Sequence, residues 1–209
     1  MKLFAKSALA ALVIAAPSFA VAAEYDIDAA HSSANFVVTH LMVSKVRGSF
    51  SKVSGTINLD DKDITKSSVN ATIDASTINT QEPKRDEHLR SPDFFEVAKF
   101  PTITFKSTKV EKAGSGYKVS GDLTMHGVTK PTVLTVEELT EDKEAFGGVK
   151  RGVTATTKLS RKDYGLTWNK ALETGGVAVS DEVKVTLELE LNKKQAAAPA
   201  APAAAPAKK

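Results

Sequence analysis

The ten-residue stretch EVKVTLELEL, residues 182–191, decides the fold class of this chain because its side chains alternate strictly between polar and apolar. Successive side chains of a β-strand point to opposite faces, so one face of the stretch is valine and leucine and the other is glutamate, lysine and threonine. This alternation is typical of a strand with one face in a core and the other in water. Seven further segments alternate similarly: 33–40, 46–59, 68–75, 102–110, 117–125, 132–139 and 149–159.

Short turn sequences separate most of these segments, among them Gly114-Ser115-Gly116 and Gly147-Gly148. Segments joined in this way favour an all-β fold whose strands follow one another up and down in antiparallel order. Closure into an eight-stranded barrel would remove the exposed strand edges that promote aggregation. A two-layer sandwich is the alternative. Several segments are long for sandwich strands, so we expect the barrel.

Two segments break the alternation. Residues 80–100 (TQEPKRDEHLRSPDFFEVAKF) are charged at first, and Pro83 stands where the first turn of a helix accepts proline. We expect a short helical insertion here, with Leu89 as its apolar anchor, lying across one mouth of the barrel. Residues 160–180 are irregular as well and contain Trp168, the only tryptophan of the chain.

The two ends of the chain differ in composition from its middle. Residues 1–23 combine Lys2 and Lys6, a short apolar run and small residues up to Ala23, which is the pattern of a secretory signal peptide. The apolar run is shorter than the ~20 residues that a membrane-spanning helix needs. Residues 196–209 are almost entirely alanine and proline and predict a disordered tail. We therefore expect one domain over residues 24–195, periplasmic or secreted.

Composition limits the classes of partner. Cleavage after Ala23 would lower the formal net charge from +3 to +1, because it removes two lysines and no acidic residue. Basic residues are scattered rather than gathered in a stripe, so nucleic-acid binding is not expected. The chain has no cysteine, so an exported domain would depend on burial rather than disulfides for its stability.

The sequence offers few residues for catalysis or metal binding. The four histidines are His31, His40, His88 and His126. They form no closely spaced pair, so no metal site is expected, and no Gly-x-Ser-x-Gly or phosphate-binding loop is present. Ser49 and Lys52 match the Ser-x-x-Lys motif of acylating enzymes, but that motif needs a helix and these two lie in an alternating segment. We expect no catalytic residues and no cofactor.

The apolar faces leave open what fills the barrel. Eight strands enclose a space that either the protein's own side chains or one ligand can fill. A fully packed barrel would show the same alternation, and it is the alternative to a tunnel. Many inward side chains are small or β-branched and only 6% of residues are aromatic, which favours a long slot. The residues expected to line it are Phe36, Val38, Phe50, Ile57, Val69, Ile73, Phe94, Phe95, Ile103, Phe105, Leu123, Trp168, Val185 and Leu187.

Six blocks, in order over residues 25–192, resemble the signature segments of the YceI-like polyisoprenoid-binding family. They are YDID (25–28) with HS (31–32) and FVVTH (36–40), VRGSF (46–50), RDEHLRSPDFF (85–95), FPTITFKS (100–107), GDLTMHGVTKP (121–131), and RKDYGL (161–166) with DEV (181–183). One departure is Tyr164, where phenylalanine is commoner in the family, but both residues bury a ring. The resemblance implies a lipocalin-like barrel that holds an isoprenoid quinone, a prenyl diphosphate or a similar amphiphile, and no catalytic residue.

Given such a ligand, Arg85, His88 and Arg90 of the insertion are candidates to contact the lipid head group at the barrel mouth. Their alternative role is structural, through ion pairs with Asp86 or Asp93 that hold the insertion on the barrel. Two further histidines of the resembling blocks, His40 and His126, are expected to be structural residues at strand ends.

Three functions are compatible with these features. A carrier or store of a long-chain lipid is the leading hypothesis. An enzyme acting on the bound lipid would need a titratable pair inside the barrel, which the pattern does not show. A partner protein of a membrane electron-transfer or stress-response system is the third. Beyond the lipid, we expect a transient contact with a membrane or membrane protein, and a homodimer.

Overall fold

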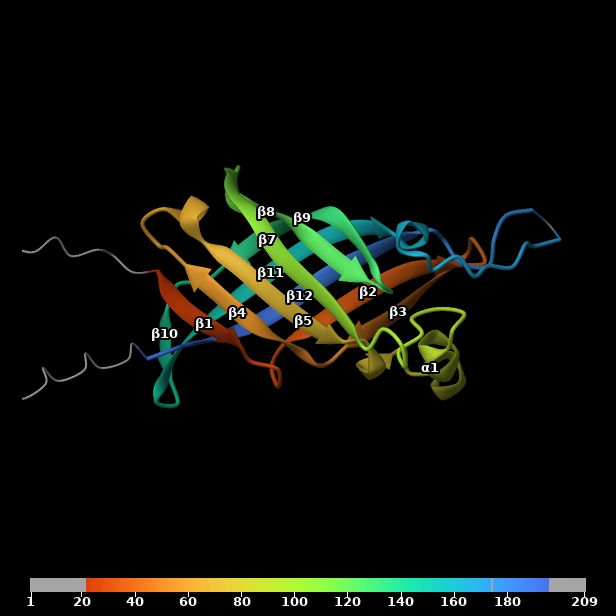
Figure 1. The fold of residues 1–209 in the computed structure, drawn as a ribbon, viewed down its shortest axis with the longest axis horizontal. Helices are drawn as coiled ribbons and strands as arrows, with labels where there is room; N and C mark the ends of the chain where they lie inside the picture. Colours follow the sequence, from red (N-terminus) through yellow and green to blue (C-terminus); the bar gives the residue numbers. More distant parts are fainter. Residues whose placement is uncertain (1–21, 174, 196–209) are drawn as a thin grey trace, which may run out of the picture.

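The computed structural model describes residues 22–173 and 175–195, in which one antiparallel sheet closes into a barrel (Figure 1). Its strands are β1 (Ala23–Ile27), β2 (Ser33–His40), β3 (Ser44–Phe50), β4 (Val53–Leu59), β5 (Ser68–Asp74), β6 (Ile78–Asn79), β7 (Thr102–Ala113), β8 (Gly116–Met125), β9 (Val128–Leu139), β10 (Lys143–Ala145), β11 (Gly148–Ser160) and β12 (Glu182–Lys193). The predicted tail, and the predicted signal peptide apart from its last two residues, lie outside the described residues.

Neighbouring strands of the wall follow the order of the chain. β1 and β2 are two pieces of one wall strand, because both pair with β12. β3 and β4 form the next wall strand, since β3 pairs with β2 and β4 pairs with β1. β6 continues the line of β5 and pairs with β3. β11 pairs with β9 on one side and β12 on the other, which closes the wall. The predicted eight-stranded, up-and-down antiparallel barrel is therefore confirmed.

The alternating segment 46–59, expected to be one strand, is two strands. β3 ends at Phe50 and β4 begins at Val53. Both side chains are buried although they are three residues apart, a spacing that alternation within one strand does not allow. The sequence therefore carries a shift in phase at this point. β1 was also absent from the eight alternating segments, because it has only five residues before the 28–32 loop that separates it from β2.

The predicted helical insertion is α1 (Pro83–Arg90), which lies at one end of the barrel (Figure 1). Pro83 occupies the first turn, and the Glu82 side chain caps the helix by accepting the Lys84 N–H at 3.0 Å. Asp86 is buried and accepts hydrogen bonds from both the N–H (2.8 Å) and the hydroxyl (2.5 Å) of Thr80. These bonds attach the helix to the segment that follows β6. No helix among the described residues has the length and apolar character needed to span a membrane.

Candidate functional site

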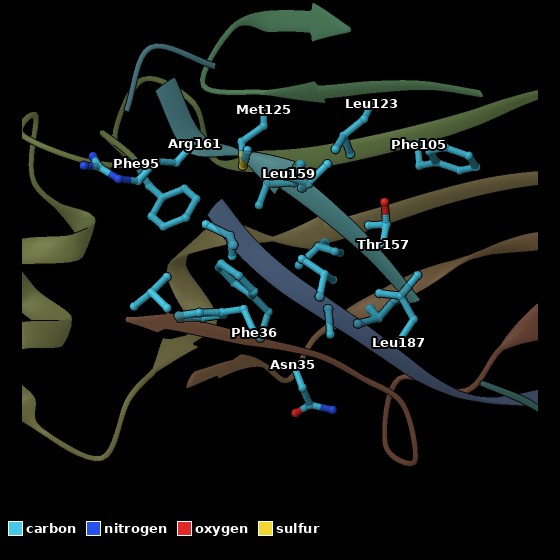
Figure 2. A pocket seen from close by; sticks show the side chains of 18 of the residues that line it. Asn35, Phe36, Phe95, Phe105, Leu123, Met125, Thr157, Leu159, Arg161 and Leu187 are labelled. Atoms are coloured by element: carbon cyan, nitrogen blue, oxygen red, sulfur yellow. The ribbon is translucent and has the colours of Figure 1, made fainter. Parts of the chain in front are cut away.

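The barrel encloses a cavity of about 360 Å³ whose wall is almost entirely apolar. Figure 2 shows Phe36, Leu123, Leu159 and Leu187 projecting into this shared space, whereas Asn35 points away from it. All fourteen residues that the sequence predicted as tunnel lining contribute to the wall. They are Phe36, Val38, Phe50, Ile57, Val69, Ile73, Phe94, Phe95, Ile103, Phe105, Leu123, Trp168, Val185 and Leu187. The barrel is therefore not filled by its own side chains.

Aromatic side chains gather at the end of the cavity that α1 covers. Phe50 packs against Phe36 with ring centroids 5.7 Å apart, and edge-on against Phe95 at 5.6 Å. The ring centroids of Phe94 and Trp168 lie 5.2 Å apart. The insertion and the loop 165–181, which are distant in sequence, thus meet over the barrel end.

The three predicted head-group residues are not equivalent. Arg85 and His88 line the cavity, and Arg90 does not. Arg85 donates two hydrogen bonds to Thr80, at 2.7 Å to its hydroxyl and 2.9 Å to its carbonyl. His88 Nε2 lies 2.8 Å from a carboxylate oxygen of Asp93.

Arg90 has a structural place instead. Its guanidinium donates to the backbone carbonyls of Ser76 (2.8 Å) and Ile78 (2.7 Å). The alternative for this residue was an ion pair, but its partners are the carbonyl of Ser76, which lies between β5 and β6, and that of Ile78, which begins β6. These bonds fix α1 to the barrel wall.

Arg161 is a cavity residue that the tunnel prediction missed. Its side chain is 4% exposed, and it donates to the carbonyls of Leu166 (2.5 Å), Trp168 (2.7 Å) and Ser180 (3.0 Å). Burial lowers its pKa, and the carboxylate of Asp181 opposes that shift. Arg161 therefore organises the loop that carries Trp168.

His40 and His126 both lie at strand ends, as expected. His40 ends β2, lines the cavity and forms a β-bridge with Val179 of the loop. His126 follows β8, and its Nδ1 lies 3.1 Å from the Tyr164 carbonyl oxygen. The Tyr164 ring is buried, and its hydroxyl lies 3.1 Å from that of Thr132, so the departure from phenylalanine brings its own hydrogen-bond partner.

The cavity wall is poor in groups for acid–base or nucleophilic chemistry. Over the described residues, no aspartate, glutamate, lysine, tyrosine or serine lines it, and the histidines that do are His40 and His88. Thr157 lines it, and its hydroxyl donates to the Val133 carbonyl at 2.9 Å. The arrangement suits the burial of a hydrocarbon chain rather than the positioning of reacting groups.

A charged network lies at the opposite end of the barrel. The Arg151 side chain, 5% exposed, donates to both carboxylate oxygens of Asp61 (2.9 and 2.8 Å) and to Asp142 (2.5 Å). Tyr25 and Lys193 also donate to Asp142, at 2.8 and 2.6 Å. Burial raises the pKa of Asp142, but these hydrogen bonds outweigh it and lower the pKa to about 2. The network joins Tyr25, Asp61 and Lys193, which are far apart in the chain, to Asp142 and Arg151, which are close in sequence.

A second charged cluster lies on the outside of the wall, where side chains of Asp28, His31 and Glu190 come within 4.8 Å of one another. Spacing along the chain gave no sign of this cluster. Lys150 Nζ lies 2.5 Å from Glu190, 2.8 Å from Asn192 and 3.7 Å from Asp28. The lysine supplies the positive charge that the carboxylates need, so the cluster is an ion-pair network.

Comparison with known proteins agrees with this geometry. A family model described as the YceI-like domain matches residues 25–191. A UPF0312 protein of Vibrio cholerae is 42% identical over 159 residues, which cover 75% of this chain and 84% of that protein. The solved structure of BcnA from Burkholderia cenocepacia has a TM-score of 0.69 at 22% identity, over 78% of this chain and 98% of that one.

A polyisoprenoid binding domain from Saccharophagus degradans, implicated in plant cell wall breakdown, has a TM-score of 0.57 at 22% identity and covers 83% of this chain and 99% of its own. These structures share the barrel fold. Because the family model spans nearly all of the described residues, the chain belongs to the YceI-like domain family.

Proposed function

We propose that this protein binds a long-chain isoprenoid lipid in the barrel and acts as its carrier or store, without catalysis. The observation that carries the proposal is the apolar cavity of about 360 Å³ inside a closed barrel. Its volume lies in the range of small-molecule sites, which is about 300–1,000 Å³. The Saccharophagus domain, which shares this fold, is described as binding polyisoprenoids, and this supports the ligand class.

The apolar wall makes chain length the main source of affinity. Each methylene moved from water into such a wall contributes about 0.8 kcal/mol. A branched isoprenoid suits a wall that mixes β-branched and aromatic side chains, such as Val38, Ile73 and Phe105. Affinity would then come from the chain, and the barrel end would select the head group.

The barrel end favours a neutral or weakly charged head group over a diphosphate. Arg85 already donates two hydrogen bonds to Thr80, and His88 is paired with Asp93. Arg161 is buried among backbone carbonyls, and Arg90 points to carbonyls outside the cavity. A diphosphate needs several donors at once. A quinone carbonyl needs one, and the Arg85 guanidinium, which has five N–H groups and uses two of them on Thr80, supplies it.

We place this activity in the periplasm. The support is the sequence of residues 1–23, with Lys2 and Lys6, a short apolar run and small residues before Ala23. Detection of the protein, cleaved near Ala23, in an osmotic-shock fraction would test this placement. Recovery only with cytoplasmic markers would contradict it.

A chain-length series tests the lipid proposal. Quinones with increasing numbers of isoprene units compete with a fluorescent fatty probe for the purified, delipidated protein. We expect affinity to rise with each unit, by up to about tenfold for every two methylenes buried, and to level off when the chain exceeds the cavity. Affinity that is independent of chain length would contradict the proposal.

The same assay tests the head group. A quinone and a prenyl diphosphate with the same number of isoprene units are compared directly. We expect the quinone to bind at least as tightly. Tighter binding of the diphosphate would overturn the assignment of a neutral head group and leave the chain-binding role intact.

A further inference from the structure

The turn between β2 and β3 exposes three apolar side chains. Leu41, Met42 and Val43 are 42%, 62% and 87% exposed. Leu41 and Met42 have positive φ angles of 51° and 61°, and the Val43 N–H donates to the His40 carbonyl at 3.0 Å. Hairpin turns with this backbone favour asparagine and glycine. Large apolar residues at this turn suit neither its backbone conformation nor exposure to water, so we expect a partner to cover them.

This apolar tip, residues 41–43, is held in place beside the cavity. The Leu41 N–H donates to the Ala178 carbonyl at 2.8 Å, and the Thr39 N–H donates to the Ser180 hydroxyl at 2.9 Å. Below the tip, Val38 and Val46 of the same hairpin line the cavity. Figure 1 shows the β2–β3 turn and the loop 165–181 projecting together from the barrel end that carries α1, away from the termini.

The charge around the tip selects the kind of partner. No aspartate or glutamate occurs between residues 29 and 59. Lys45 and Arg47, just below the tip, are exposed, and neither forms an ion pair within the described residues. In the neighbouring loop 165–181 the charges of Lys170 and Glu173 cancel, and Asp181 is paired with Arg161 and Lys162. Two copies of this cationic hairpin would repel each other, whereas an anionic lipid surface would attract it.

We propose that the apolar tip docks this end of the barrel on an anionic lipid bilayer. The three side chains enter the head-group region, and Lys45 and Arg47 face the anionic lipids. An isoprenoid chain then passes between the bilayer and the cavity without crossing water. The purpose of this docking rests on the proposed lipid binding, but attachment to vesicles does not require a filled cavity. The two proposals can therefore fail separately.

Vesicle flotation with the purified protein tests the docking. The vesicles are phosphatidylcholine, with or without phosphatidylglycerol. The variant Leu41→Asn/Met42→Gly/Val43→Ser removes the apolar tip and installs residues that the turn prefers, so its stability should be unchanged or higher. The control is Phe146→Asn. Phe146 is likewise an exposed apolar residue, with a positive φ of 51°, but it lies in the β10–β11 turn at the opposite end of the barrel.

We expect wild type to float with the anionic vesicles, and the triple variant to show at least about tenfold weaker partitioning. Phe146→Asn should behave as wild type, and Lys45→Gln/Arg47→Gln should lose the preference for phosphatidylglycerol. All variants share both termini, so any contribution of the ends cancels. Failure of wild type to float, equal floating of the triple variant, or an equal loss in Phe146→Asn would each overturn the proposal. Quinone competition in solution, measured on the same variants, reports separately on the cavity.

Discussion

The imidazole of His88 packs edge-on against the indole of Trp168, with ring centroids 5.2 Å apart and an interplanar angle of 89°. His88 belongs to α1 and Trp168 to the loop 165–181, so this contact joins the two irregular segments across the end of the cavity. Both side chains line the cavity. A lipid head group that reaches this end must pass beside them or displace them.

Trp168 emission should therefore report on the ligand. Since the chain has a single tryptophan, the signal comes from this site alone. Adding a long-chain quinone should quench the emission and saturate at the stoichiometry found by probe displacement. Trp168→Phe should lose the signal and keep the binding. Unchanged emission while the probe is displaced would show that the ligand does not reach this end.

Filling the middle of the cavity should block the lipid. Ala155 on β11 is 3% exposed, lies opposite Leu187 in the wall and lines the cavity. Ala155→Phe should weaken binding of long-chain quinones by about tenfold or more, and overpacking should cost about 1–3 kcal/mol of stability. The control is Thr154→Phe, whose side chain faces outward on the same strand. Unimpaired binding by Ala155→Phe, measured by probe displacement, would place the ligand elsewhere.

Arg161 should hold the Trp168 loop in place. Arg161→Lys keeps the charge but cannot reach all the carbonyls that the guanidinium satisfies, and each buried carbonyl left unpaired costs about 1–3 kcal/mol. Urea unfolding should show this loss, and limited proteolysis should cut within the loop 165–181. Lys162→Gln, an exposed neighbour, should change stability by less than about 1 kcal/mol. Equal stability of Arg161→Lys and wild type would contradict this role.

The network at the other end of the barrel should give an acid-sensitive contribution to stability. The pKa of Asp142 is about 2 in the folded protein, below its ordinary value of 3.8. Its contribution is thus fully present above the unfolded value and is lost as pH falls from about 3.8 to about 2. Urea unfolding measured at several pH values should show that the free energy of unfolding falls less in Asp142→Asn than in wild type as the pH is lowered through this range. The same slope in both proteins would contradict the assignment.

The wall of the barrel was predictable because alternation records which side of a strand faces inward. The phase of Val185 and Leu187 follows directly from the stretch 182–191. The three-residue spacing of the apolar residues Phe50 and Val53 also marks the break between β3 and β4. Alternation on either side hides this change of phase, so the two strands were predicted as one. The presence of a cavity was not predictable from the pattern, because a packed barrel has the same alternation.

The ends of the barrel were less predictable for a different reason. Arg161, Leu166 and Val179 line the cavity from an irregular segment without periodicity, so alternation did not mark them as lining residues. The partners of Arg151 and Asp142 come from distant segments that only the closed wall brings together. The family resemblance predicted Arg85, His88 and Arg90 as one group. Only the folded structure shows that Arg90 donates to nearby backbone carbonyls and does not line the cavity.

The most direct test of a lipid-carrying barrel is mass spectrometry of an organic extract of the protein, purified from its own cells without detergent. We predict a near-stoichiometric isoprenoid lipid with a neutral head group. The lipid should be depleted in an extract of Ala155→Phe prepared in parallel. An extract of the wild-type protein without any long-chain lipid, from cells that contain such lipids, would contradict the account.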